Sequence, residues 1–319
     1  MKQIVIPNDL LISVSVRFWL YLIPNIASIA CVIFVLFHLL SDRTLRQALY
    51  NHIIIVLLVI VFIYEVTSIP LMLHYYRFRD TWQIGHSFAH FWTFIDYFCY
   101  TTQLIGFAWA AIERHILVFN HQWMSTQRKR ILFHYLPIAL LLIYSFTYYF
   151  TLILFPFCED FFVFSPFNGV PISCVLFDPI LLTYDTIAHQ ALPTLLIVIL
   201  SFALLIRIII FKSHIRQTTQ WRKQRKMTIQ LVSISILYLL FMGPRTILQF
   251  CGFIGYLTDD IVMAYFHSGF LANYILFFLP FVCCGSMPEL GKKIRNFFHC
   301  QQQAITVQIY PMIQVQTRV

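Results

Sequence analysis

Charged side chains lie within and at the end of one long apolar stretch of the chain, residues 86–119. Asp96 lies in the first third of this stretch, and Glu113 and Arg114 lie near its far end. In a helix, the eighteen positions from Asp96 to Arg114 make five whole turns over about 27 Å, so both side chains share one face near opposite ends. Charges inside a membrane are costly and mark functional sites by default. We therefore expect Asp96 to meet a ligand near one membrane surface and Arg114 to meet a cytoplasmic partner near the other.

Glu113 and Arg114 also have a structural interpretation. Long charged side chains near a helix end can reach the membrane interface and leave their stems in the apolar region. This explanation fits Asp96 less well because a short carboxylate cannot reach far.

Two further charges lie in apolar stretches. Glu65 is expected either to be buried in the bundle or to reach the outer interface, and the usual inward orientation of intramembrane acids favours burial. Arg245 directly follows Gly243 and Pro244, at a height similar to that of Asp96. An Asp96–Arg245 ion pair is therefore a hypothesis that competes with a cationic ligand at Asp96.

The composition is typical of a membrane protein. Of the 319 residues, 60% are hydrophobic, 18% are aromatic and only 11% are charged, and the mean hydropathy is +0.76. A soluble domain of this length needs far more polar surface. Apolar stretches of membrane-spanning length recur seven times, at residues 18–40, 50–73, 86–119, 131–155, 186–211, 227–254 and 262–286. The sequence therefore predicts an all-α membrane protein, a seven-transmembrane helix bundle.

The distribution of basic residues predicts the orientation. The net charge is +9, which in a soluble protein would indicate nucleic-acid binding. Here, 17 of the 22 Lys and Arg residues fall in or beside the segments that follow the first, third, fifth and seventh stretches. Basic loops remain cytoplasmic. We predict a multi-pass plasma-membrane protein with its amino terminus outside, its carboxyl terminus in the cytoplasm and no nucleic-acid partner.

The predicted topology divides the chain into four parts. Residues 1–17 form a short extracellular segment, and residues 18–286 form the seven-transmembrane domain. Residues 287–300 are basic and aromatic, which predicts an amphipathic helix lying on membrane lipids. Residues 301–319 are the cytoplasmic tail.

The carboxyl-terminal part carries two candidate sites. Cys300 ends the amphipathic segment and is a palmitoylation candidate, with a free cytosolic thiol as the alternative. The last residue, Val319, and its carboxylate could add to the groove of a PDZ domain.

Cysteines in the predicted outer regions can form a disulfide. Cys158 and Cys174 lie in the longest outer loop, which faces an oxidising space. Cys251 lies near an outer helix end and is a rival partner.

The seven stretches, Glu113-Arg114-His115 at the end of the third, and the amphipathic segment after the seventh together resemble a rhodopsin-like G-protein-coupled receptor. The prolines of the fifth, sixth and seventh stretches extend the resemblance: Pro193, Pro244 and Pro280. The resemblance implies that Glu113 holds Arg114 in the inactive state and that Arg114 meets a heterotrimeric G protein in the active state. It also implies a loop disulfide between Cys158 and Cys174, because the family's third-span cysteine falls on Ala89.

Asp96-Tyr97 falls where amine receptors and some peptide receptors of that family carry their ligand-binding Asp, which implies a cationic ligand. Departures from the family pattern include Met242 in place of a Trp before Pro244, and Leu279 in place of the Asn before Pro280. Near the inner end of the sixth stretch, Gln224, Arg225 and Lys226 stand where the family has an acid, so no salt bridge from there to Arg114 can form. The loss of this inactive-state lock predicts high basal activity. The side chains expected around the ligand are Asp96, Tyr97, Arg245, Asn273 and Glu65.

The predicted function is therefore a receptor that transmits an extracellular amine or peptide signal to a heterotrimeric G protein, without a cofactor. The alternative is a small transporter or channel, against which the chain has no duplicated halves. A third interpretation is an intramembrane metalloenzyme, since His86 and His90 have the spacing of metal ligands on a helix. No Glu lies beside them, so we interpret them as interfacial histidines and expect neither a metal nor an enzyme activity.

Overall fold

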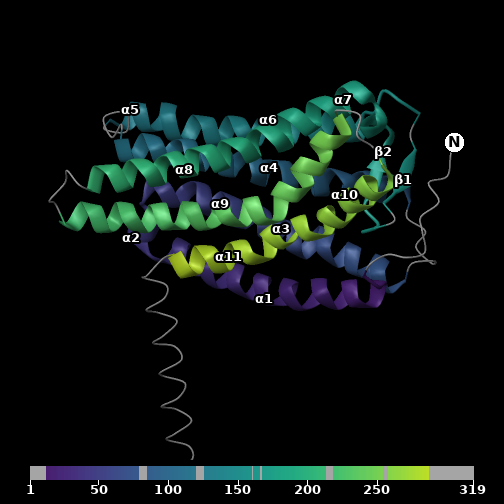
Figure 1. The fold of residues 1–319 in the computed structure, drawn as a ribbon, viewed down its shortest axis with the longest axis horizontal. Helices are drawn as coiled ribbons and strands as arrows, with labels where there is room; N and C mark the ends of the chain where they lie inside the picture. The colour runs from purple at the N-terminus through teal and green to yellow at the C-terminus, as the bar shows by residue number, and fades with distance from the viewer. Residues whose placement is uncertain are drawn as a thin grey trace, which may run out of the picture.

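The computed structural model describes residues 12–78, 85–119, 126–159, 161–165, 167–212, 218–253 and 258–286. These residues form an elongated bundle of long helices (Figure 1). The helices are α1 (Val14–Ser41), α2 (Arg43–Arg46), α3 (Leu49–Arg77), α4 (His86–Phe119), α5 (Gln127–Arg130), α6 (Leu136–Leu154), α7 (Pro179–Tyr184), α8 (Leu192–Lys212), α9 (Thr218–Phe253), α10 (Asp259–Ala272) and α11 (Tyr274–Ser286). Short π-helical segments, η2 (Ile131–Tyr135) and η4 (Asp185–Ala191), lead into α6 and α8, and a 3₁₀ turn, η3 (Cys174–Phe177), precedes α7. The strands are β1 (Phe162–Phe164) and β2 (Pro171–Ser173).

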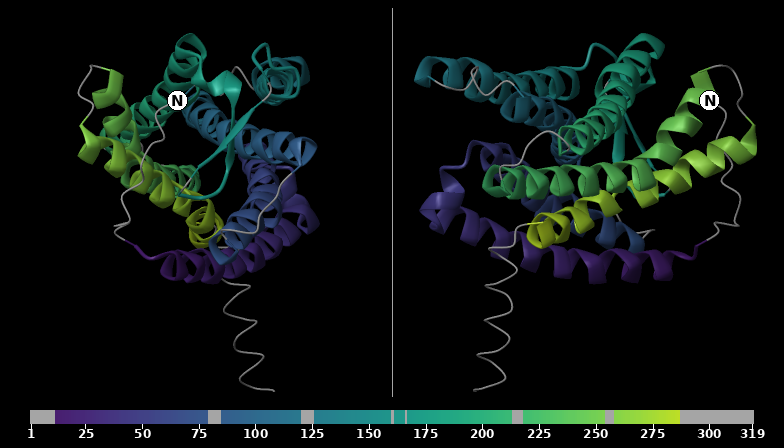
Figure 2. Two further views of the ribbon diagram at one scale, coloured as in Figure 1. Left: turned by 90° about the vertical axis from the view of Figure 1, so that its right-hand side faces the viewer. Right: turned by 60° about the vertical axis from the view of Figure 1, so that its left-hand side comes forward.

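Helix α4 is at the centre of the packing. It packs against α3, α6 and α8, whereas α1 packs against α3 and α11, and α9 packs against α8, α10 and α11. The end-on view on the left of Figure 2 shows the long helices arranged around the interior of the bundle. Any side chain on the inward faces of α4 can therefore contact several other helices.

The bundle is apolar outside and contains many polar side chains inside. Large hydrophobic side chains are exposed along α1, α6, α8 and α9, including Ile23, Ile143, Ile199 and Leu240. The buried side chains include many polar ones: Asn25, Ser28, Asn51, Glu65, Ser68, Thr93, Thr101, Thr102 and Gln103. An apolar surface of this extent on a soluble monomer would cause association. The distribution is that of a protein whose surrounding solvent is lipid.

Six helices within the described ranges are long and apolar enough to cross a membrane, namely Val14–Ser41, Leu49–Arg77, Gln127–Leu154, Pro179–Leu204, Val232–Gly252 and Met263–Ser286. The chain is therefore an all-α, multi-pass membrane protein. Helix α4 covers the third predicted stretch with the predicted bounds but is not one of the six, because polar residues such as Thr101, Thr102 and Gln103 interrupt it.

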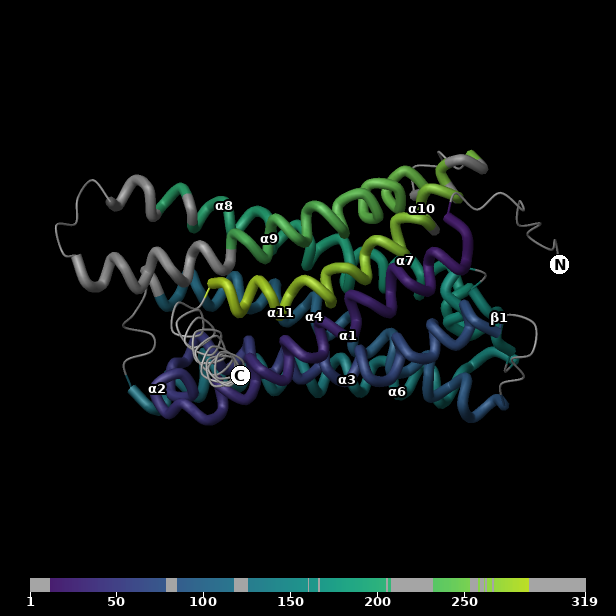
Figure 3. The backbone as a smooth tube through the Cα atoms, turned by 90° about the horizontal axis from the view of Figure 1, so that it is seen from below, coloured from purple at the N-terminus to yellow at the C-terminus, as the bar shows by residue number. Residues whose placement is uncertain are grey.

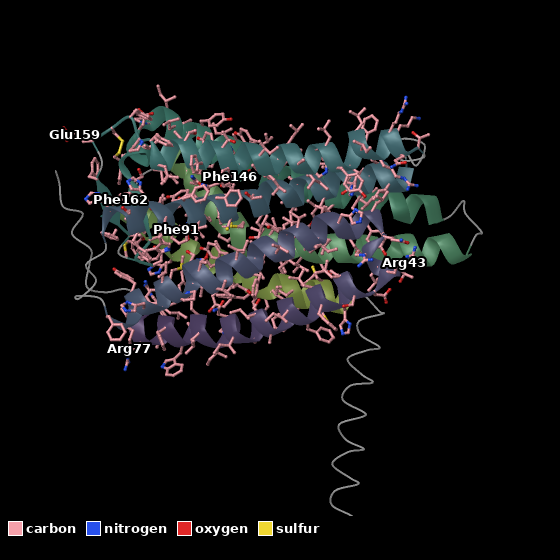
Figure 4. All side chains as sticks on the ribbon, turned by 180° about the vertical axis from the view of Figure 1, so that it is seen from behind. Arg43, Arg77, Phe91, Phe146, Glu159 and Phe162 are labelled. Carbon is pink, nitrogen blue, oxygen red and sulfur yellow. A yellow bond between two sulfur atoms is a disulfide. The ribbon has the colours of Figure 1, made fainter. Side chains whose placement is uncertain are left out.

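The connections lie at the two ends of the bundle. Figure 3 shows α2 at one end, and β1 with the amino-terminal part of α1 at the other. In Figure 4, Arg43 marks the first end, and Arg77, Glu159 and Phe162 mark the second. We call these the α2 end and the hairpin end. Consecutive long helices therefore run in alternating directions.

The hairpin end is covered by a disulfide-linked loop. Strands β1 and β2 pair antiparallel, with Val163 opposite Ile172. Cys158 and Cys174 form a disulfide, with their Cα atoms 6.2 Å apart, while Cys251 is a free thiol. Thr93 of α4 donates a hydrogen bond to the backbone carbonyl of Pro171 in β2 (2.8 Å), which ties the loop to α4.

The three prolines of the predicted fifth, sixth and seventh stretches all lie within helices. Pro193 is the second residue of α8, directly after η4, and Pro244 and Pro280 lie inside α9 and α11. The seventh predicted stretch is two helices, because Asn273 separates α10 from α11. A proline removes one backbone donor and bends the helix, and neighbouring helices can satisfy the freed carbonyl.

Several predictions lie outside the described residues. These are the amphipathic segment 287–300 with Cys300, the tail 301–319 with Val319, and most of the extracellular segment 1–17.

Candidate functional site

Asp96 accepts two hydrogen bonds, both from α3. The hydroxyls of Tyr64 and Ser68 donate to Asp96 Oδ1 at 2.8 and 2.6 Å. Trp92, one turn before Asp96 on α4, donates from its indole nitrogen to Ser68 Oγ at 3.1 Å. Tyr64 and Ser68 are four positions apart, so they present their hydroxyls on one face of α3. Asp96 itself is only partly buried, and its second oxygen, Oδ2, makes no hydrogen bond within the described part of the chain.

The hydrogen bonds at Asp96 continue through Tyr64 to Asn273 in the seventh stretch. The Tyr64 hydroxyl lies 3.5 Å from Oδ1 of Asn273, at the break between α10 and α11. Asn273 Nδ2 donates to the Tyr21 hydroxyl of α1 (3.0 Å), which donates to the backbone carbonyl of Phe270 (2.9 Å). Four helical segments are thus connected by one chain of hydrogen bonds. Asn273, expected beside the ligand, belongs to this network.

Arg245 contacts Tyr265 of α10. Its Nη2 donates to the Tyr265 hydroxyl at 2.9 Å, and the guanidinium carbon lies 4.5 Å from the centroid of that ring. The hypothesised Asp96–Arg245 ion pair is wrong for this structure: each has other partners, and no ion pair joins them among the described residues. The two charges are nevertheless close enough to interact electrostatically.

Aromatic side chains and a small cavity complete this region. Tyr97 and Tyr100 of α4 are partly buried, and the Tyr100 hydroxyl contacts the sulfur of Met242 at 3.4 Å. A small cavity of about 10 Å³, room for about one water molecule, is lined by Tyr100, Gln103, Leu104, Tyr238, Met242, Ala272, Ile275 and Leu276. Tyr97, Tyr100 and Tyr265 all lie within electrostatic range of Asp96 or Arg245.

Glu65 is fully buried, with 0% of its surface exposed, so of the two alternatives the buried one holds. Both of its carboxyl oxygens are without a hydrogen-bond partner within the described residues. Its backbone carbonyl accepts from Asn25 of α1 at 3.4 Å. Glu65 makes no hydrogen bond to Asp96 or Asn273, so the structure does not place it in the same network as the other predicted ligand-site residues.

Glu113, near the α2 end, has a histidine as its partner. The Glu113 carboxylate is hydrogen-bonded to Nδ1 of His134 in η2. Nε2 of His134 lies 2.9 Å from Nδ1 of His52 in α3, and His52 Nε2 lies 2.8 Å from the carbonyl oxygen of Arg46. Glu113 and His134 are almost completely buried. This series joins α4, η2, α3 and the carboxyl end of α2.

Arg114 is also buried, but it is directed elsewhere. Its guanidinium carbon lies 5.2 Å from the centroid of the Tyr50 ring in α3. Glu113 is bonded to His134 and makes no ion pair with Arg114 among the described residues, although the two side chains lie within electrostatic range of each other. The interfacial interpretation of this pair is wrong, because both side chains are buried in the bundle.

Four residues of these two hydrogen-bonded groups were not predicted from the sequence: Tyr64, Ser68, His52 and His134. For Tyr64 and Ser68 there was a signal, since two hydroxyls four positions apart in an apolar helix lie on one face. His134 and His52 lie near the ends of two different stretches, and their positions in the sequence give no sign that they face each other.

No protein-family model matches the chain, and no curated protein matches it.

Proposed function

We propose that the chain is a rhodopsin-like G-protein-coupled receptor that binds a small cationic ligand at Asp96 and signals to a heterotrimeric G protein through Arg114. In this proposal α4 is a seventh crossing, the hairpin end is extracellular and the α2 end is cytoplasmic. The protein lies in the plasma membrane.

The observation that carries the proposal is that α4 has a bonded polar centre near each of its ends. Asp96 is bonded to α3 near the hairpin end, and Glu113 is bonded to η2 near the α2 end. A receptor needs such a connection because a ligand on one side must change a binding surface on the other. Burying these polar groups has no evident purpose in a bundle that only has to be stable.

Tyr64 provides a route by which a ligand can act on the rest of the bundle. Its hydroxyl has one proton, so it can donate to Asp96 or to Asn273 but not to both. In the structure the shorter contact is to Asp96. A cation at the open Oδ2 of Asp96 draws negative charge away from Oδ1, which weakens the hydrogen bond from Tyr64 and favours donation to Asn273, where α10 meets α11.

The α2 end supplies the response. Glu113 is held by His134, and Arg114 packs on Tyr50. A state in which these contacts open would direct Arg114 to a cytoplasmic partner. A ligand populates that state only by its differential affinity for it.

A G-protein recruitment assay in cells tests the proposal. Arg114→Ala should abolish recruitment, and Arg43→Ala, an exposed arginine at the same end of the bundle, should retain it at equal surface expression. Recruitment by Arg114→Ala at the wild-type level would contradict the proposal. Solute flux through the purified chain in liposomes would favour the transporter or channel instead.

A further inference from the structure

We propose that Glu113, His134 and His52 together bind one exchangeable proton, taken from the water at the α2 end of the bundle. This proton site is separate from the ligand site proposed at Asp96. Its test needs neither a ligand nor a G protein, so its failure would leave the proposed function untouched.

The three side chains form an unbranched series of three hydrogen bonds. The Glu113 carboxylate is bonded to Nδ1 of His134, and Nε2 of His134 lies 2.9 Å from Nδ1 of His52. Nε2 of His52 lies 2.8 Å from the backbone carbonyl oxygen of Arg46. Both nitrogens of each imidazole ring are therefore used, and an oxygen stands at each end of the series.

Three hydrogen bonds need three protons, one in each bond. The carbonyl of Arg46 can only accept, so His52 must carry a proton on Nε2. A neutral imidazole carries one proton and an ionised carboxylate carries none, so two neutral histidines with an ionised Glu113 supply only two protons. The geometry therefore requires one additional proton, and losing it would break one of the three bonds.

Neighbouring groups favour the additional proton on the histidines. Arg114 lies within electrostatic range of Glu113, and a nearby cation favours the ionised carboxylate. The centroid of the Tyr135 ring lies 4.6 Å from that of His134 and 5.6 Å from that of His52. Aromatic rings attract cations at such distances. The surrounding elements contribute further titratable groups: Asp42, Arg43 and Arg46 at α2, Tyr50 on α3, Arg128, Lys129 and Arg130 on α5, and Cys283 on α11.

His52 gives the site access to water. Glu113 and His134 are almost completely buried, whereas His52 is only partly buried and lies in the first turn of α3. Arg46, whose carbonyl accepts from His52, is exposed. A proton can enter at His52 and move along the hydrogen bonds to His134. The site therefore responds to the pH at the α2 end, which the proposed topology places in the cytoplasm.

A second buried acid–histidine pair, Asp185 and His189, needs no additional proton. Nδ1 of His189 lies 2.9 Å from Oδ1 of Asp185, and Nε2 lies 2.7 Å from the hydroxyl of Tyr144. A neutral His189 donates from Nδ1 and accepts the Tyr144 proton at Nε2, so the protons present are enough. This pair is a matched control for the Glu113 series.

The pH dependence of thermal stability, measured on the purified full-length protein in lipid nanodiscs, tests the inference. Above the ordinary pKa of histidine, from about pH 6.5 to 8.5, the native state should hold one proton that the unfolded chain lacks. Stability falls with rising pH where the native state binds more protons, by up to about tenfold in the folding equilibrium constant per pH unit. The melting temperature of the wild type should therefore fall over this range.

Glu113→Gln is the decisive variant. Its amide can donate to Nδ1 of a neutral His134, so the same three bonds form without the additional proton. Its melting temperature should fall less with rising pH than that of the wild type. In His52→Gln an amide can replace both contacts of the imidazole, and His134 must still carry two protons, so the wild-type pH dependence should remain. Asp185→Asn should also keep it.

Equal pH dependence in the wild type and Glu113→Gln, or its loss in His52→Gln, would overturn the inference. Nitrogen NMR of isotope-labelled histidines in the wild type gives a second test that does not require a variant to fold. At about pH 8, where free histidine is neutral, one imidazole should still be doubly protonated. A spectrum with only neutral histidines would also overturn the inference.

Discussion

Glu113 of α4 is hydrogen-bonded to Nδ1 of His134 in η2, and both side chains are almost completely buried. The acid next to Arg114 is therefore held by a histidine of another helix. This hydrogen bond helps to join α4 to η2, which leads into α6, at the α2 end of the bundle.

His134→Phe should destabilise the protein because it leaves the buried Glu113 carboxylate without its partner. We expect a loss of about 1–3 kcal/mol in the free energy of unfolding, measured by thermal or chemical unfolding in nanodiscs. In the double variant with Glu113→Gln, the two losses should be less than additive because the residues are in contact. Fully additive losses would show that the contact does not contribute to stability.

Tyr64→Phe should cost about 1 kcal/mol in the free energy of unfolding. The ring is buried and would be kept, while the hydroxyl between Asp96 and Asn273 would be removed. Tyr238→Phe is the matched control, because that ring is also buried and its hydroxyl makes no hydrogen bond within the described residues. Equal losses in the two variants would contradict a special role for the Tyr64 hydroxyl.

Gly269→Ala should weaken ligand responses with little effect on stability. A Cβ at Gly269 would meet Nη1 of Arg245, the flexible end of its side chain, so the guanidinium must move. We expect less than about 1 kcal/mol of destabilisation, together with a reduced response to any ligand that needs Arg245. Gly285→Ala is the control, because nothing lies within 4 Å of the added Cβ. An unchanged ligand titration in Gly269→Ala would argue against contact between Arg245 and the ligand.

Glu65→Gln should leave stability unchanged or raise it. The carboxyl group is fully buried and has no hydrogen-bond partner among the described residues. A neutral side chain of the same shape avoids the cost of burying a charge, which is several kcal/mol for an unpaired ion. A fall in melting temperature would mean that Glu65 makes a stabilising interaction in the native state.

Removing the loop disulfide should destabilise the hairpin end. Cys158→Ala with Cys174→Ala opens a loop of 16 residues, which corresponds to about 3 kcal/mol in the chain-entropy model. Cys251→Ala, at a free cysteine, is the control. A melting temperature that is unaffected by reduction in the wild type would contradict this prediction.

The sequence by itself determined the apolar stretches and their order, whereas the break of the seventh stretch into α10 and α11 was seen only in the structure. Apolar stretches of membrane length and the prolines among them are local properties, and the third stretch, 86–119, has the observed bounds of α4. The sequence also placed Asp96 and Arg114 on one helix near opposite ends, because helical periodicity alone sets that relation.

Only the tertiary structure decided which groups are partners. Asp96 is bonded to Tyr64 and Ser68 and not to Arg245, and Glu113 is bonded to His134 and not to its neighbour Arg114. These contacts join residues that are far apart in the chain, and they depend on the rotation and height of each helix in the bundle. Those quantities are set by the packing of several helices together, whereas the charge and spacing of residues along one helix leave them open.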